Sequence, residues 1–317
     1  MTARTTALHA RHTEAATGLL FAAPHLALFT LFLLLPVAYG FYISLHRWHI
    51  LSPTHPFVGL ENYRAALGDD LFWLALRNTA YFVLLVVPLG NLVSLVLALC
   101  LAGLRRFSTF YKVAYYVPVV ISIAVVAVLW RWLYNVQVGL INLYLAGVVG
   151  WLRGCGLPLP PFEPIPWLAD PRLVMPSIAL MTIWWQAGGN MLLYLAGILQ
   201  IPVDYYEAAT LDGANAWQRF RHVTWPLLRP TTLFCLVFSV LGSFQVFGQS
   251  YVLFAPGAGP ARSGLTLVLY MYLQGFNQHE LGYGTAVAYL LFLLVLLLTA
   301  IQFRLFNERG AGFGGAR

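Results

Sequence analysis

The feature that most constrains the fold of this chain is a set of six long stretches that carry almost no charge. They lie at 18–45, 78–102, 113–136, 173–199, 231–255 and 283–303. A helix rises about 1.5 Å per residue, so about 20 apolar residues cross the roughly 30 Å of bilayer hydrocarbon. The stretches lack the alternation of barrel strands, and a chain that is 60% hydrophobic and 9% charged cannot cover a water-soluble surface. We therefore expect an all-α integral membrane protein with six transmembrane helices.

These stretches predict one membrane domain at 18–306, preceded by an N-terminal arm at 1–17 and followed by a tail at 307–317. The apolar segment Gly139 to Leu152 is too short to span and contains three glycines, so we expect a short helix on the outer surface. The first stretch continues to Leu45 without a convincing cleavage site, which favours an uncleaved span.

The distribution of arginine and lysine predicts the orientation. Eleven of the 18 bases fall on the side that holds both termini and the loops at 103–112 and 200–230, six fall on the other side, and Arg131 lies within the third stretch. Positive residues accumulate in cytoplasmic loops. Both termini are therefore expected in the cytoplasm, and the net charge of +7 reflects topology rather than nucleic-acid binding.

The six stretches contain no Asp or Glu, and Arg131 is the only charge well inside one of them. Ion-coupled carriers usually bind the coupling ion at ionisable groups near the membrane midplane. This argues against secondary transport, although a sodium site built from hydroxyls and carbonyls stays open. The only lysine, Lys112, follows Tyr111 and so cannot belong to a phosphate-binding loop. Active transport by this chain would need an ATPase on another polypeptide.

No cofactor or metal site is expected in this chain. The three cysteines are widely separated and form no C-x-x-C pair, so each is predicted to be a free thiol. A membrane enzyme is also disfavoured, because no nucleophile, metal cluster or carboxylate pair gathers at a membrane face.

The loop at 200–230 predicts a helix-turn-helix. Pro202 suits a first turn, Asp212 and Gly213 allow the turn that ends the first helix, and a second helix from Ala214 to about Val223 should stop ahead of Pro226. Such a loop could dock another protein, or it could be an amphipathic connector held to anionic lipid by its arginines. The physical pattern leaves both interpretations open.

The order of residues in this loop resembles the EAA loop of binding-protein-dependent ABC importer permeases. The residues that carry the resemblance are Glu207, Ala208, Ala209, Asp212, Gly213 and Pro226. In that family the loop forms coupling helices that insert into a cleft on the ATPase. The resemblance implies that these six residues couple this chain to an ATPase.

The resemblance covers nearly the whole chain and narrows to carbohydrate-uptake permeases of the maltose and glycerol-3-phosphate type. It is carried by VGLENYRAAL at 58–67, YYVPVVIS at 115–122, FGQSYVLF at 247–254 and GYGTAVAYLL at 282–291. One departure is Gly257-Ala258-Gly259-Pro260, where the family usually has two adjacent glycines before the proline.

The resemblance implies a type I ABC importer permease with the MetI-like fold, in a bacterial or archaeal cytoplasmic membrane. It implies a heterodimer with a second, related permease, two copies of an ATPase subunit that bind ATP and Mg, and an extracytoplasmic binding protein. The expected cargo is an oligosaccharide, a monosaccharide or glycerol-3-phosphate. The alternative is a carrier or channel that is not driven by ATP.

Uncharged polar and aromatic residues within the fourth and fifth stretches are the candidates for a substrate path, since such groups suit sugar rings and hydroxyls. The positions that match the substrate-contacting segments of the maltose-type relatives are Trp185, Gln186, Asn190, Phe244, Gln245 and Gly248. The same side chains, with Gly188 and Gly189, could instead join helices to one another.

Overall fold

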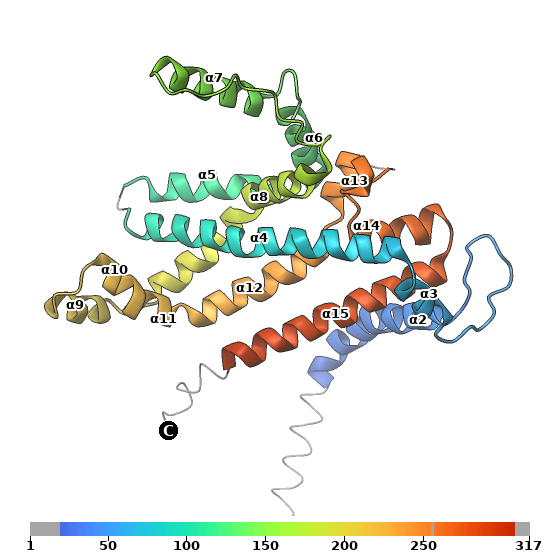
Figure 1. The fold of residues 1–317 in the computed structure, drawn as a ribbon. Helices are drawn as coiled ribbons and strands as arrows, with labels where there is room; N and C mark the ends of the chain where they lie inside the picture. Colours follow the sequence, from blue (N-terminus) through green and yellow to red (C-terminus); the bar gives the residue numbers. More distant parts are fainter. Residues whose placement is uncertain (1–19, 105, 255–256, 308–317) are drawn as a thin grey trace, which may run out of the picture. The chain divides into compact units, whose positions relative to one another are not determined.

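The computed structural model describes residues 20–104, 106–254 and 257–307. The named elements in this part of the chain are helices (Figure 1). The chain divides into two compact units, and each is described by itself. One contains the described residues up to Gly68 and Tyr272–Tyr289, and the other contains Asp69–Met271 and the residues from Leu290 onward.

The first unit is built on a helix over Leu20–Ser44, which includes a π-helical turn, η1 (Thr30–Leu34), and α2 (Leu35–Ser44). It also holds α3 (Glu61–Leu67), η4 (Leu273–Asn277) and the beginning of α15 (Leu281–Asn307). The Asn62 amide donates to the backbone carbonyls of Ser44 and His46 at 2.8 and 2.9 Å, closing the loop that follows α2. The loop is thereby fixed on α3.

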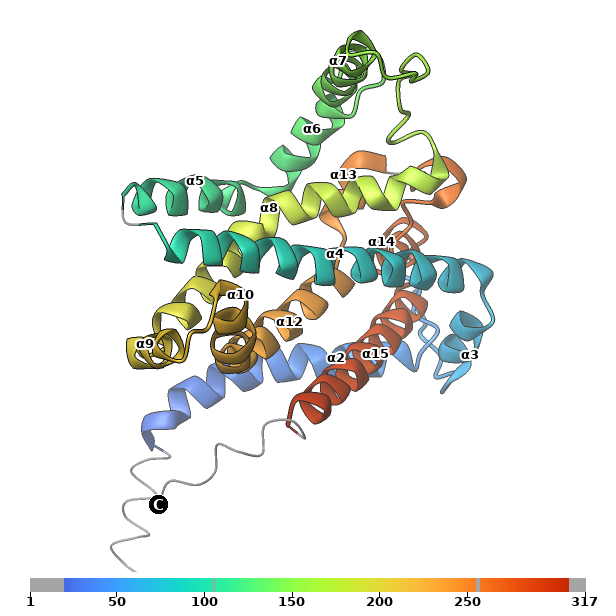
Figure 2. The same cartoon turned by 60° about the vertical axis from the view of Figure 1, so that its left-hand side comes forward.

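The second unit contains most of the helices. They are α4 (Asp70–Ala102), α5 (Ser108–Val120), α6 (Ile123–Leu133), α7 (Leu140–Gly154), α8 (Pro171–Leu199), α9 (Val203–Leu211), α10 (Ala216–Arg219), η2 (Phe220–Thr224), α11 (Trp225–Leu227), α12 (Arg229–Phe244), α13 (Gly248–Phe254), η3 (Pro260–Arg262), α14 (Leu267–Tyr272) except its last residue, and the later part of α15. Helices α4 and α8 lie side by side, and α5 and α12 also pack on this pair (Figures 1 and 2).

The two central helices begin at carboxylate caps. Asp69 accepts a hydrogen bond from the Leu71 amide at 2.8 Å ahead of α4, and Asp170 accepts one from the Arg172 amide at 2.8 Å ahead of α8. Each carboxylate satisfies an amide that the helix itself leaves unpaired, and its charge opposes the positive end of the helix dipole. The starts of the long helices are thus encoded locally.

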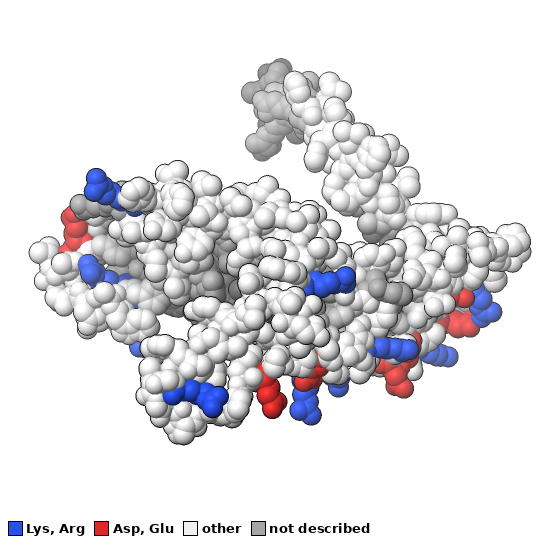
Figure 3. All heavy atoms as spheres, turned by 90° about the horizontal axis from the view of Figure 1, so that it is seen from above, with Lys and Arg blue, Asp and Glu red and all other residues white. Residues whose placement is uncertain are grey.

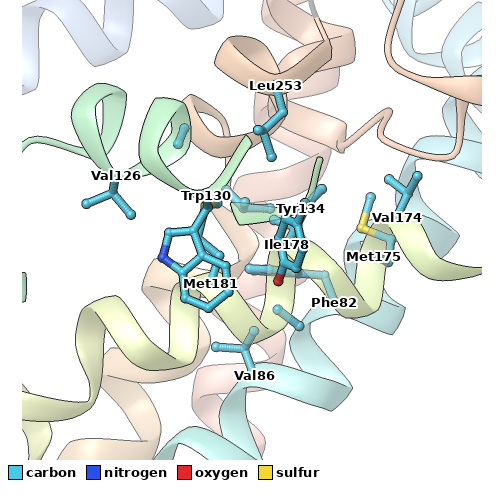
Figure 4. Packing of buried hydrophobic residues seen from close by; sticks show 13 residues of the cluster. Phe82, Val86, Val126, Trp130, Tyr134, Val174, Met175, Ile178, Met181 and Leu253 are labelled. Atoms are coloured by element: carbon cyan, nitrogen blue, oxygen red, sulfur yellow. The ribbon is translucent and has the colours of Figure 1, made fainter. Parts of the chain in front are cut away.

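The main core of the second unit joins α4, α6, α8 and α13 (Figure 4). Phe82 of α4, Ile178 of α8 and Val126 of α6 are almost fully buried there. The Tyr134 hydroxyl, also buried, donates to the Ser177 carbonyl at 2.9 Å. This core holds the first half of α8 against α4 and α6.

Four helices among the described residues are long and apolar enough to cross a membrane: Leu20–Ser44, Asp70–Ala102, Arg229–Phe254 and Leu281–Leu305. Most of the face in Figure 3 carries neither acidic nor basic side chains, as a surface in contact with lipid requires. Helix α8 has 29 residues but is less apolar, because polar residues and glycines occupy its middle. It packs against α4, α5 and α12 rather than lipid alone. The predicted total of six spans, which counts α8, stays a prediction.

The stretch at 113–136 forms two helices rather than one. Helices α5 and α6 are bent by 98° relative to each other at a short break. Pro118 lies in the last turn of α5 and cannot donate a backbone hydrogen bond, and Ile121 and Ser122 then adopt extended ψ angles of 136° and 137°. The pair remains one candidate span, with a break in its middle.

The short helix expected at Gly139 to Leu152 is present as α7, which stands away from α4 and α8 in both ribbon views (Figures 1 and 2), and its place on the outer surface stays a prediction. Asn142 is its one buried residue. Its carboxamide donates to the Ile165 carbonyl at 3.0 Å and accepts from the Trp167 indole at 3.0 Å. One asparagine therefore ties α7 to the segment that leads into α8.

Candidate functional site

The loop at 200–230 folds into the predicted helix-turn-helix, which we call the knob (residues 203–227). Helix α9 ends at Leu211, and Gly213 follows with a φ of +78°, in the left-handed region that glycine adopts without strain. Helix α10 begins with a capping box. The backbone N–H of Gln218 donates to Asn215 Oδ1, and the backbone N–H of Asn215 donates to Gln218 Oε1. This Asn-x-x-Gln pattern is a helix-start signal that was not predicted from the sequence.

The prediction that the second helix stops ahead of Pro226 is wrong. The helix continues from α10 through the π-helical turn η2 into α11, with Pro226 inside α11. Proline has no backbone N–H, so it cannot donate the hydrogen bond to the carbonyl four residues earlier that continues an α-helix. The π turn just before Pro226 changes the bonding register, with the Trp225 amide reaching the Phe220 carbonyl, so the helix accommodates the proline.

Hydrogen bonds tie the two limbs of the knob together. The Tyr206 and Thr224 hydroxyls lie 3.0 Å apart, and the Arg219 guanidinium donates to the Thr210 hydroxyl at 3.3 Å. The Thr210 hydroxyl in turn donates to the Tyr206 carbonyl at 2.7 Å. These bonds join α9 to the continuous helix that α10 and η2 form.

The knob exposes a mixed apolar and acidic surface. Leu211 is 90% exposed, and Tyr205 and Trp217 are also exposed. Of the predicted coupling residues, Glu207, Ala208, Asp212 and Gly213 are exposed, while Ala209 and Pro226 are partly buried. A small cavity of about 470 Å³ lies between Glu207, Leu211 and Arg219. Exposed large apolar side chains on a rigid projection suit contact with another protein.

Two of the predicted substrate-path residues contact the break between α5 and α6. The Trp185 indole donates to the Ile121 carbonyl at 3.0 Å, which satisfies a backbone group that the break frees. Gly248 begins α13, and a Cβ atom on it would lie 2.9 Å from Ile123 Cγ2. The break therefore lies between α8 on one side and α13 on the other.

Asn190 has a different environment. Its amide donates to the Ser239 hydroxyl at 3.0 Å, and the Asn91 amide donates to the same hydroxyl at 3.0 Å. Tyr194 completes the group by donating to Asn91 Oδ1 at 3.2 Å. The network joins α4, α8 and α12, so Asn190 serves as a helix-joining residue in this structure. The network was not predicted from the sequence, although Asn91, Tyr194 and Ser239 are all uncharged polar side chains within apolar stretches.

The remaining substrate-path candidates differ in exposure. Phe244 is 5% exposed, Gln245 is exposed at the break between α12 and α13, and Gln186 is exposed on α8. A hydrogen bond stabilises the break between α12 and α13, in which the Thr266 hydroxyl donates to the Val246 carbonyl at 2.8 Å. The structure thus brings Trp185 and Gly248 to one place, and it leaves the two glutamines free to meet a ligand.

Arg131, the charge within the third stretch, binds the end of α13. Its guanidinium donates to the Val252 and Leu253 carbonyls at 2.6 Å each. Carbonyls in the last turn of a helix lack partners within the helix and carry its negative dipole end. Arg131 therefore has a structural role in joining α6 to α13.

Cys100, Cys155 and Cys235 are free thiols. Among the described residues, no group of three or more His, Cys, Asp or Glu side chains could hold a metal ion.

Comparison with known proteins decides the family. Residues 90–310, which include the knob, both breaks and α8, match the model of the binding-protein-dependent transport system inner membrane component. The chain belongs to this family. It is the membrane permease subunit of an ABC importer, a multi-pass protein that transports and does not itself hydrolyse ATP, which is the task of a separate subunit.

Curated relatives extend the similarity to almost the full length. A probable ABC transporter permease of Pyrococcus horikoshii is 35% identical over 88% of this chain and 92% of its own. The arabinooligosaccharides permease of Bacillus subtilis is 34% identical over 93% and 90% of the two chains. The trehalose/maltose permease of Thermococcus litoralis is 32% identical over 93% and 95%. These relatives favour the ATP-driven importer over a carrier or channel without ATP.

Solved structures agree on the fold. A chain of a bacterial ABC transporter that imports the acidic polysaccharide alginate matches with a TM-score of 0.77 at 22% identity, covering 95% of this chain and 99% of its own. A second structure of such a transporter, in complex with an alginate pentasaccharide-bound periplasmic protein, gives a TM-score of 0.75 at 22% identity, with 92% and 93% covered.

Proposed function

We propose that this permease carries a sugar or sugar-like solute across a bacterial or archaeal cytoplasmic membrane, with both termini in the cytoplasm. The sugar class rests on the curated relatives, which include permeases for arabinooligosaccharides, lactose and trehalose or maltose. It also fits the aromatic and amide groups of α8 and of the break after α12, since sugar rings stack on aromatic faces and sugar hydroxyls pair with amides. The cargo arrives on an extracytoplasmic binding protein.

The substrate path in this proposal passes the two helix breaks. Gln186 and Gln245 are exposed amides that can bind hydroxyls, and Trp185 presents an aromatic face while its N–H holds the break at Ile121. Phe244 and Gly248 complete the path. Asn190 contributes to the path through the network that positions α8 on α12.

In this proposal the knob couples the opening and closing of the substrate path to ATP. In the proposed complex a second, related permease forms a heterodimer with this chain, and two ATPase subunits bind ATP and Mg below it. Glu207, Ala208 and Gly213 meet one ATPase, with Ala209, Asp212 and Pro226 shaping the knob. Closure of the ATPases pushes the knob, and α8 and α12, which flank it in the chain, turn the path outward.

The observation that carries the proposal is the rigid, exposed knob, with its tyrosine–threonine tie and its 90% exposed Leu211. An exposed apolar surface of this kind is suited to burial against a partner, which in this proposal is the ATPase.

Charge reversal at the knob tests the coupling. Glu207→Lys should leave the complex in the membrane but reduce substrate-stimulated ATP hydrolysis at least about tenfold, because a contact in a desolvated interface is worth about 2 kcal/mol or more. ATP hydrolysis and sugar uptake are measured on complexes in proteoliposomes. Glu14→Lys, the same change in the N-terminal arm, is the control and should keep normal coupling. Normal stimulation in Glu207→Lys would contradict the role given to the knob.

A further inference from the structure

A large apolar groove lies beside the knob and has no role in coupling or in the substrate path. Its volume is about 1000 Å³, and its lining includes Val96 and Leu99 of α4, Ile198 of α8, and Tyr206, Trp217 and Arg219 of the knob. All these elements belong to the second unit. The groove is therefore a feature of one compact body.

The floor of the groove is a packed core. Leu95, which lines the groove, belongs to a buried cluster with Ala98, Tyr194 and Leu228. The groove thus has a firm base, and its open side exposes apolar residues. Val96 is 49% exposed, Leu199 66% and Trp217 65%.

The location of these residues points to lipid. Val96 and Leu99 belong to a helix that is apolar enough to cross the membrane, and they lie near its end. Tryptophan and arginine at the end of an apolar surface are typical of the interface between hydrocarbon and headgroups. In the orientation proposed above, the groove opens at the inner leaflet, where acyl chains are the surrounding solvent.

The charge of the lining selects the headgroup. Among the described residues that line the groove, Arg219 is the only charged one. Its guanidinium donates one N–H to the Thr210 hydroxyl. Its other N–H groups lie in one plane, the geometry that binds phosphate oxygens. Arg219 also lines the small cavity that contains Glu207. A bound headgroup would therefore lie next to a residue of the coupling surface.

We infer that this groove is a binding site for an anionic phospholipid of the inner leaflet, with acyl chains along α4 and α8 and the phosphate on Arg219. The inference rests on the proposed placement of the knob at the cytoplasmic surface. It differs from a general attraction of basic loops to the membrane, because it assigns one lipid to one groove and one arginine.

Two pairs of variants test the site. Arg219→Gln removes the phosphate ligand, whereas Arg221→Gln removes an exposed charge two residues away that does not line the groove. Val96→Trp fills the groove, whereas Val93→Trp places the same ring on an exposed position of the same helix outside the lining. Each member is compared with its partner in the assembled importer.

The measurement is native mass spectrometry of the complete complex, extracted from nanodiscs that contain phosphatidylglycerol and phosphatidylcholine. The wild type, Arg221→Gln and Val93→Trp should retain phosphatidylglycerol, whereas Arg219→Gln and Val96→Trp should retain about fivefold less. Equal retention in all five proteins, equal retention of phosphatidylcholine, or no lipid retained by the wild type would overturn the inference. A wild-type chain that fails to assemble with an ATPase would instead refute the proposed function.

Discussion

At the residue scale, polar side chains within the apolar helices mainly form hydrogen bonds that join one helix to another. The Ser239 hydroxyl accepts from both Asn91 and Asn190, and the Trp185 indole satisfies the Ile121 carbonyl at a helix break. Trp185 and Asn190 are recognisable in the sequence as aromatic or polar groups within spans. Their partners are not predictable from the sequence, because those partners lie on other helices and only packing brings them together.

The turn at Ala258 and Gly259 shows how a departure from the family pattern fits its backbone. Ala258 has a φ of 57° and Gly259 a φ of 79°, both in the left-handed region. Glycine reaches that region at less cost than alanine. The two adjacent glycines expected from the family resemblance therefore suit this turn, and Ala258 is its tolerated replacement.

The shared serine predicts a stability effect. Ser239→Ala removes the acceptor of two amides at once and should lower the stability of the assembled protein by about 1–2 kcal/mol. Ser250→Ala is the control, since the buried Ser250 hydroxyl has no hydrogen-bond partner among the described residues, and it should be neutral or stabilising. Thermal unfolding of the purified complexes measures both. Equal melting temperatures for Ser239→Ala and the wild type would contradict the role of the network.

The tryptophan at the break predicts an effect on transport. Trp185→Phe keeps an aromatic ring but leaves the Ile121 carbonyl without its donor, which costs about 1–3 kcal/mol and should reduce uptake about fivefold or more. The matched change is Trp184→Phe, since Trp184 packs its ring on Trp130 at a centroid distance of 5.7 Å. Initial rates of sugar uptake compare the two. If both variants transport equally well, the indole N–H has no part in the path.

At the element scale, local signals predicted the helix-turn-helix of the knob and the short helix that became α7. Local signals did not predict whether a proline would end a helix or be accommodated within it. Pro118 is visible in the sequence, yet whether a proline ends a helix or merely kinks it depends on partners for the freed backbone groups, here Trp185. Pro226 is the opposite case, because the π turn before it lets the helix continue.

The contact between α5 and α8 depends on a single glycine. A Cβ on Gly188 would lie 2.0 Å from the Tyr115 carbonyl oxygen, whereas a Cβ on Gly189 would meet Val119 Cγ1 at an ordinary 3.8 Å. Gly188→Ala must push the two helices apart, so it should cost about 3 kcal/mol or more and reduce the yield of assembled complex.

Gly189→Ala is the control for this prediction and should assemble as well as the wild type. Size-exclusion chromatography of detergent-extracted complexes measures the yield for both variants. A normal yield for Gly188→Ala would show that α5 is not held against α8 in the membrane.

At the scale of the whole molecule, composition and the apolar stretches were enough to predict a helical membrane protein, and the loop pattern was enough to predict its family. The division into two units was not predictable, because it follows from packing between segments far apart in the chain. The helix over Leu20–Ser44 has only 6% of its most apolar window buried. It requires lipid or another subunit around it, in keeping with the proposed heterodimer.

The central claim is that a separate ATPase drives this permease in response to a sugar-loaded binding protein. The most direct test reconstitutes this chain with the second permease and the ATPase and measures ATP hydrolysis while sugar-loaded binding proteins are added one at a time. We predict that one loaded binding protein raises hydrolysis about tenfold or more, and that the same protein without sugar does so less. Assembly without stimulation by any sugar-loaded binding protein would contradict the sugar assignment, and failure to assemble with any ATPase would contradict the coupling role of the knob.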